Sequence, residues 1–79
     1  MFYVYILQSQ RDKSFYTGVT NDLRKRIRDH NSGQMRYSST KSPYVIAWYC
    51  ALRNKKKALG FEKYLKSGSG FAFARKRFV

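Results

Sequence analysis

A strand, a turn and a basic helix follow one another within residues 15–31, and this stretch limits how the rest of a 79-residue chain can fold. Residues 15–19 alternate as a half-buried strand does, so Tyr16 and Gly18 share one face. The opposite face carries Phe15, Thr17 and Val19. A glycine inside a strand is usually kept for a bulge or for the close approach of another group, such as a phosphate. We therefore expect Tyr16 to stand beside bare backbone.

The helix of this stretch has its own start and stop signals. Asn21 is the predicted N-cap, because an amide oxygen can accept a hydrogen bond from a free backbone N–H of the first turn. Leu23 and Ile27 form a buried stripe at i and i+4, and Asn31-Ser32-Gly33 ends the helix.

The polar residues of this helix divide into two groups. At about 100° per residue, Arg26 and His30 fall along one edge of the buried stripe, whereas Lys25 and Arg28 point toward water. Together with Tyr16, this edge offers a phenol, a guanidinium and an imidazole. The combination suggests an active site.

The chain is strongly basic, with 17 Lys and Arg against 4 Asp and Glu and a formal net charge of +13. Such an excess opposes compaction and attracts polyanions, so nucleic acid is the expected partner. A membrane is a weaker candidate, because no run approaches the ~20 apolar residues of a spanning helix and no signal peptide opens the sequence. We expect one domain, residues 1–79, whose small core depends on its aromatic residues.

The single cysteine, Cys50, lies in an apolar run and cannot form an internal disulfide. The simplest interpretation is a small buried hydrophobic residue. A single cysteine without a disulfide partner is typical of proteins of the reducing cytoplasm.

Two further strands are predicted. Residues 2–7 form a dense β-branched and aromatic run that is typical of a strand buried on both sides. The polar residues 8–14 suit a hairpin connection, which would place Tyr5 and Tyr16 on neighbouring strands. Residues 44–52 form the longest apolar run and are expected to be the central strand, with Trp48 buried in it.

A polar, basic segment, residues 32–42, precedes that last strand. It contains Arg36 and Lys41 and is long enough to serve as a substrate loop. Pro43 closes it.

A second helix begins after Asn54, its expected N-cap. Its first turn is the run Lys55-Lys56-Lys57, which opposes the helix dipole and is explained either by a polyanion or by a solvated face. The buried stripe of this helix is Ala58, Phe61 and Leu65. Glu62 lies beside that stripe, and an inward carboxylate needs a partner, either Lys66 at i+4 or a divalent cation.

The last part of the chain is glycine-rich and then aromatic and basic. Residues 67–70 are predicted to stop the second helix, and residues 71–78 to form a final amphipathic piece. Arg75, Lys76 and Arg77 lie on its basic side.

Several of these residues form an ordered set that resembles the GIY-YIG nuclease superfamily. Tyr5-Ile6-Leu7 is followed by Tyr16-Thr17-Gly18, then by Leu23-x-x-Arg26-x-x-x-His30-Asn31, and finally by Glu62-x-x-Leu65-Lys66. The chain is most similar to the small single-domain branch, which is often compared with the incision domain of the bacterial excinuclease C subunit. The first motif lacks the name-giving glycine, and Phe71 stands where a basic residue is expected in that branch.

The resemblance implies an α+β fold with a three-stranded antiparallel sheet flanked by helices, in the order β-β-α-β-α-α. It also implies metal-dependent hydrolysis of a phosphodiester. Tyr16 would be the general base and Tyr5 would position the water. Arg26 would grip the phosphate, and His30 would take up the proton or hold Tyr16. Glu62 would bind one Mg²⁺ or Mn²⁺. Without the resemblance, these side chains could also be core aromatics, a surface arginine and a histidine at a helix C-terminus.

The nucleic acid would be DNA in preference to RNA. Besides the catalytic residues, the residues expected to contact it are Gly18, Lys25, Arg28, Arg36, Lys41, Lys55, Lys56, Lys57, Lys66 and Arg75. A targeting partner protein is compatible with so small a chain, and the sequence leaves the oligomeric state open. Two other classes of function remain, a non-catalytic module that binds nucleic acid and a basic scaffold protein on ribosomal RNA.

Overall fold

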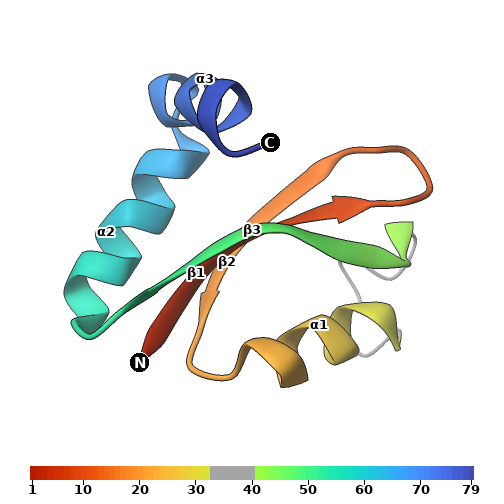
Figure 1. Cartoon of the computed structure of the whole chain (residues 1–79), viewed down its shortest axis with the longest axis horizontal. Coiled ribbons are helices and arrows are strands. Elements are labelled where there is room, and N and C mark those ends of the chain that lie inside the picture. Colours follow the sequence, from red (N-terminus) through yellow and green to blue (C-terminus); the bar gives the residue numbers. More distant parts are fainter. Residues whose placement is uncertain (33–40) are drawn as a thin grey trace.

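Three antiparallel strands form the sheet of the computed structural model, which describes residues 1–32 and 41–79. Within these ranges the order of elements is β-β-α-β-α-α, as the sequence predicts (Figure 1). The elements are β1 (Phe2–Ser9), β2 (Phe15–Thr20), α1 (Leu23–Asn31), β3 (Tyr44–Leu52), α2 (Lys55–Lys66) and α3 (Gly68–Arg77). None of these helices is both long enough and apolar enough to cross a bilayer.

The strand order is β2-β1-β3, so the central strand is β1 and not β3. Tyr5 on β1 pairs with Gly18 on one side and with Tyr49 on the other. The prediction of a central third strand was therefore wrong, because the hairpin partner β2 takes one side of β1 and leaves β3 at the opposite edge. Trp48 is consequently only half-buried, and its ring stacks on that of Phe78 at a centroid distance of 4.1 Å.

The side chains of β1 alternate between two cores. On one face, Val4 and Ile6 pack with Ala58, Leu65 and Ala74 of the C-terminal helices. On the other face, the partly buried side chains of α1 pack against Tyr5, Leu7 and Tyr44. Helix α1 thus lies on one side of the sheet and α2 and α3 on the other (Figure 1). Cys50 is only partly buried, against the prediction, because it lies on the edge strand.

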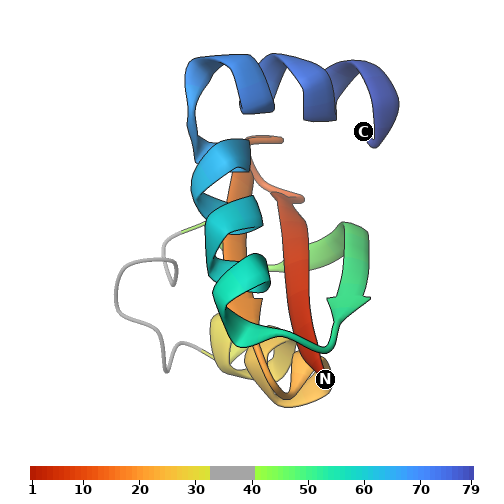
Figure 2. The ribbon, with the colours of Figure 1, turned by 90° about the vertical axis from the view of Figure 1, so that its left-hand side faces the viewer.

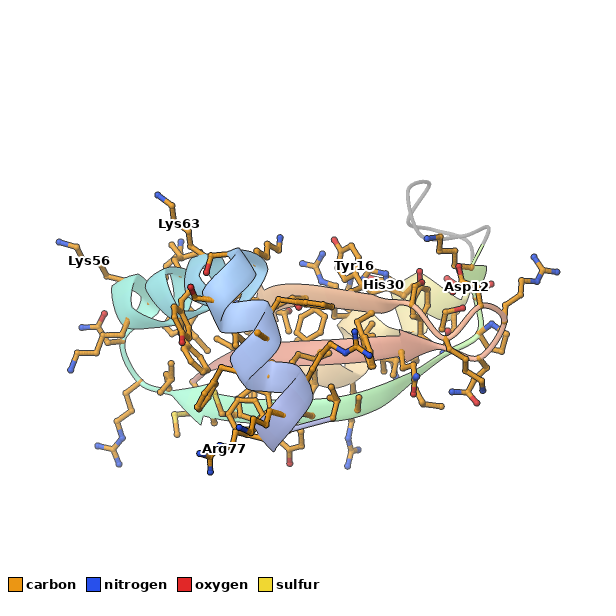
Figure 3. The ribbon with its side chains drawn as sticks, turned by 90° about the horizontal axis from the view of Figure 1, so that it is seen from above. Asp12, Tyr16, His30, Lys56, Lys63 and Arg77 are labelled. Carbon is orange, nitrogen blue, oxygen red and sulfur yellow. The ribbon has the colours of Figure 1, made fainter. Side chains whose placement is uncertain are left out.

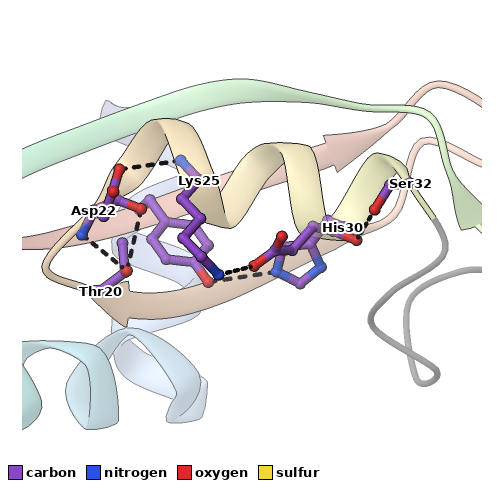
Figure 4. A network of polar contacts seen from close by, with 7 residues as sticks. Thr20, Asp22, Lys25, His30 and Ser32 are labelled. Atoms are coloured by element: carbon purple, nitrogen blue, oxygen red, sulfur yellow. Dashed lines mark hydrogen bonds and ion pairs between the residues drawn. The ribbon is translucent and has the colours of Figure 1, made fainter.

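The caps confirm one predicted helix start and correct the other. Asn54 caps α2, and its Oδ1 accepts a hydrogen bond from the backbone N–H of Lys57 at 3.0 Å. The N-cap of α1 is Asp22 instead of Asn21, with Oδ1 accepting from Lys25 N–H at 3.1 Å (Figure 4). The hydroxyl of Thr20 accepts a hydrogen bond from the backbone N–H of Asp22, which moves the start of the helix one residue on.

Helices α2 and α3 meet at a tight joint around Ser67, and α3 crosses the end of α2 (Figure 2). Ser67 Oγ donates a hydrogen bond to the carbonyl of Tyr64 and accepts one from Gly70 N–H, so this residue ends one helix and caps the next. The predicted stop was therefore only partly correct, because residues 68–70 already form the first turn of α3. A side chain at position 70 would collide with the Tyr64 carbonyl and lie 2.9 Å from Leu65 Cα.

Gly70→Ala should therefore lower the free energy of unfolding by about 1–3 kcal/mol or more, because the new methyl group would overlap backbone atoms that are fixed by the two helices. Gly68→Ala is the matched control in the same helical turn, because nothing lies within 4 Å of its added methyl. The control should be neutral or stabilise by up to ~1 kcal/mol. Denaturant melts of both variants measure the difference, and equal stabilities would contradict the tight joint.

Candidate active site

His30, near the C-terminus of α1, lies at the centre of a cluster of aromatic rings and is 0% exposed. The rings of Tyr5, Tyr16 and Tyr44 approach it edge-on, at centroid distances of 6.3, 4.8 and 5.6 Å. Figure 3 shows Tyr16 and His30 next to each other at the edge of the sheet formed by β2. Three strands and one helix therefore supply this cluster.

Tyr44 was not among the residues that the sequence singles out. Its position is fixed by Asn31 at the end of α1, which donates to the Tyr44 carbonyl at 3.1 Å and accepts from its backbone N–H. The contact joins the end of α1 to the start of β3 and crosses 13 residues of sequence. Only Pro43, which precedes the strand directly, marks this position in the sequence.

Tyr5 reaches His30 because Gly18 leaves room for its ring. The two residues are paired across β1 and β2, and a methyl group at position 18 would lie 2.6 Å from Tyr5 Cζ. The Tyr5 hydroxyl lies 3.5 Å from Nε2 of His30, at the outer limit of a hydrogen bond. The close approach expected beside Gly18 is thus made by Tyr5, and Gly18 itself is buried.

The electrostatic environment connects all five predicted catalytic residues. Burial raises the pKa of Tyr5 to about 12; Tyr16 and Glu62 add to this effect, while Arg26 opposes it. Burial, and then Arg26, lower the pKa of His30. Tyr5 therefore keeps its proton at neutral pH, and His30 is held in its neutral form.

Arg26 and Glu62 carry the charges of the site. Arg26 is half-buried, and no carboxylate of the described residues lies within ion-pair distance of it. The side chain of Glu62 is 20% exposed, and its carboxylate lies 3.4 Å from Lys66 Nζ. Of the two partners that the sequence allowed for Glu62, the structure thus contains Lys66.

Among the described residues, Glu62 is the candidate ligand for a divalent cation at this site. Among residues 1–32 and 41–79 there is no group of three or more His, Cys, Asp and Glu side chains that could hold a metal ion. Glu62 nevertheless fits the way in which Mg²⁺ is usually bound, through one or two carboxylates, waters and phosphate oxygens of the substrate. The carboxylate is only partly exposed, and its negative charge contributes to the raised pKa of Tyr5.

A cleft of about 660 Å³ opens beside Tyr16, between β2 and the joint of α2 and α3. Its walls include Tyr16, Thr17, Lys41, Tyr44, Lys66 and Phe71. Aromatic surface and two amines thus border one side of the Tyr16 ring. A substrate next to Tyr16 has room in this cleft.

The other predicted contacts to nucleic acid are spread over the surface. Lys25 pairs with Asp29 at 3.0 Å, and Lys41 pairs with Asp12 at 3.5 Å. The Arg75 guanidinium lies 5.8 Å from the centre of the Phe71 ring. Four more of the predicted contacts are exposed cations that do not line the cleft, namely Arg28, Lys55, Lys56 and Lys57. Arg36 and most of the predicted substrate loop lie outside the described residues.

Comparison with known proteins decides the family. Residues 1–76 match the family described as the GIY-YIG catalytic domain. The chain belongs to the GIY-YIG family. The predicted resemblance is thereby confirmed, and this membership supports a nuclease activity in general.

Relatives of this GIY-YIG protein carry the name UPF0213. It is 42% identical over 67 residues to UPF0213 protein CPE1444 of Clostridium perfringens, covering 84% of this chain and 71% of that protein. It is 38% identical over 64 residues to a UPF0213 protein of Vibrio campbellii, covering 80% of this chain and 61% of the relative. No solved structure matches the chain.

The contact between Gly18 and Tyr5 can be tested by adding one methyl group. Gly18→Ala should destabilise the protein by about 1–3 kcal/mol, because the Tyr5 ring must move away from its packed position. Gly60→Ala is the control, since Gly60 is exposed in α2 with open space at its Cβ. Thermal melts should show a lower melting temperature for Gly18→Ala alone. An unchanged value would mean that Tyr5 does not occupy this space.

Proposed function

We propose that this GIY-YIG protein is an endonuclease that hydrolyses phosphodiester bonds in DNA, with a divalent cation as cofactor. The observation that carries the proposal is the cluster of Tyr5, Tyr16 and His30, in which Tyr16 also lines an open cleft. Arg26 and Glu62 are close enough to this cluster for their charges to affect the pKa of Tyr5. Phosphodiester hydrolysis needs a general base that activates the attacking water, a cation that binds the phosphate, and a group that accepts the proton from the base. These side chains supply each of these functions.

Tyr16 acts as the general base, and His30 receives the proton. Tyr16 lines the cleft, and its ring centroid lies 4.8 Å from that of His30. A neutral imidazole can accept a proton, and burial keeps His30 neutral at pH 7. Tyr5 is a positioning residue in this scheme, since it is 2% exposed and retains its proton beside His30.

Arg26 binds the scissile phosphate. Its guanidinium has no carboxylate partner in the described part of the chain, so its charge is available to an anion. A planar guanidinium can bind two phosphate oxygens at once, which fixes the orientation of the phosphate.

Glu62 would hold one Mg²⁺ or Mn²⁺. When bound, the cation would neutralise charge on the phosphoryl oxygens. Lys66 would then release the carboxylate and become available to the nucleic acid, because an ion pair of 3.4 Å with an exposed lysine is weak.

The DNA path follows from the distribution of charge. Lys41 and Lys66 line the cleft, while Lys55, Lys56 and Lys57 extend the basic surface along α2. A net charge of +13 supports salt-dependent binding to the phosphate backbone. The proposal includes a cytoplasmic location, where a lone thiol stays reduced, and a role in DNA repair.

A second function, DNA binding without catalysis, is favoured by the ion pair of Glu62. A carboxylate whose partner is Lys66 needs no metal to explain its position. In that case Glu62 contributes about 0.3–0.5 kcal/mol to helix stability and nothing to a reaction.

Glu62→Gln separates the two functions, because it keeps the shape of the side chain and removes the charge that a hard cation needs. Nicking of supercoiled plasmid in Mg²⁺ should fall by at least about 100-fold, while DNA binding in chelator is kept or strengthened. Tyr16→Phe should also stop nicking, since it removes only the proposed base, but metal binding should persist.

Asp29→Asn is the matched control for Glu62→Gln. Its carboxylate also forms an i,i+4 ion pair with a lysine and has a similar exposure, 26% against 20%. Loss of its charge would only favour the neutral form of His30, so nicking should persist at pH 7. Wild-type nicking by a folded Glu62→Gln protein would refute the proposed role of the metal.

A further inference from the structure

Phe71 forms an aromatic wall of the cleft beside Tyr16 and is 43% exposed. It lies in α3, and the guanidinium of Arg75 one turn later lies over its ring at 5.8 Å. A large apolar ring at the mouth of a cleft, with a cation beside it, is not required by the core.

The surroundings of Phe71 have the chemistry of a site for a nucleobase. Single-stranded nucleic acid is typically bound by aromatic rings on which bases stack, together with cations that follow the backbone. Phe71 and Arg75 supply the ring and the nearby cation. Lys41 and Lys66 line the same cleft, and because both amines are exposed and their ion pairs with Asp12 and Glu62 are weak, they can also bind phosphates.

The cleft favours a base that has left its stack. A volume of about 660 Å³ suits a ligand of the size of a nucleotide. A base inside a duplex has both faces covered by its neighbours, so it cannot offer a face to Phe71 without unstacking. An unpaired base pays no such penalty.

We propose that Phe71 stacks an unpaired base adjacent to the phosphate that lies beside Tyr16, and that the substrate class is therefore DNA with unpaired nucleotides. The inference rests on the proposed function only for the place of the phosphate. This substrate class includes free single strands and single strands at a branch, and it excludes intact duplex.

Phe73 provides an internal control in the same helix. It is exposed to a similar degree, 40%, but its ring lies against Tyr64 and Phe78, at 6.4 and 5.4 Å, and it does not line the cleft. A general effect of removing an exposed aromatic ring from α3 would appear at both positions.

The test measures binding in chelator, so that cleavage plays no part. Wild type, Phe71→Leu, Phe71→Trp and Phe73→Leu are titrated into a single-stranded oligonucleotide containing 2-aminopurine and into the same sequence as a duplex. Phe71→Leu should weaken binding to the single strand by about 5- to 150-fold and leave duplex binding within about twofold. Phe71→Trp should preserve binding, and Phe73→Leu should match wild type. Quenching of 2-aminopurine by the wild type should be lost in Phe71→Leu.

An equal loss on single strand and duplex would overturn the proposal, as would wild-type binding and quenching by Phe71→Leu. Melting temperatures of the variants show that each is folded before it is titrated. Cleavage assays on the same single-stranded oligonucleotide in Mg²⁺ then separate the two proposals. Stacking without cleavage of the single strand would contradict only the nuclease, and cleavage with unaltered binding by Phe71→Leu would contradict only the base site.

Discussion

The contact between the Tyr5 ring and the bare backbone of Gly18 is the interaction on which the rest of the site depends. Tyr5 stands on the central strand, directly opposite Gly18, and any side chain at that position would occupy the space of its ring. The ring places a hydroxyl beside His30, which has no exposed surface. One missing side chain on β2 thus permits a phenol from β1 to contact an imidazole from α1.

The charge imbalance imposes a second constraint, because only 4 acidic residues face 17 Lys and Arg. Three carboxylates act locally, in the cap of α1 and in ion pairs of Asp29 with Lys25 and of Asp12 with Lys41. Glu62 is the acidic residue that acts on Tyr5 of the candidate site. The fold is therefore held together mainly by aromatic and aliphatic packing on both faces of β1, and much of its positive charge stays available to a polyanion.

The sequence predicted features that depend on local periodicity or on the family resemblance. Alternation in residues 15–19 placed Tyr16 and Gly18 on one face, and the hairpin length placed Tyr5 on the next strand. The i+4 spacing in α2 placed Glu62 on the inner side of the helix, where it is only 20% exposed. Each of these features is decided within about ten residues, where dihedral preferences and side-chain spacing dominate.

Features that depend on distant contacts could not be predicted in this way. The edge position of β3 follows from which side of β1 remains after the hairpin has formed. The place of Tyr44 follows from a contact with Asn31, and the helical state of residues 68–70 from a joint that only Gly70 can fit. Glycines that permit close packing and glycines that end a helix look alike in a sequence.

His30 is the only histidine in the chain, so its imidazole can be titrated by NMR without ambiguity of assignment. The proposed chemistry requires a buried, neutral imidazole beside Tyr5 and Tyr16, with its pKa lowered by burial and by Arg26. The predicted titration midpoint therefore lies below 6.5, the value of an unperturbed histidine. A midpoint at or above 6.5 would show an imidazole that is exposed or charged at this site, and would contradict the arrangement from which the proposed chemistry is derived.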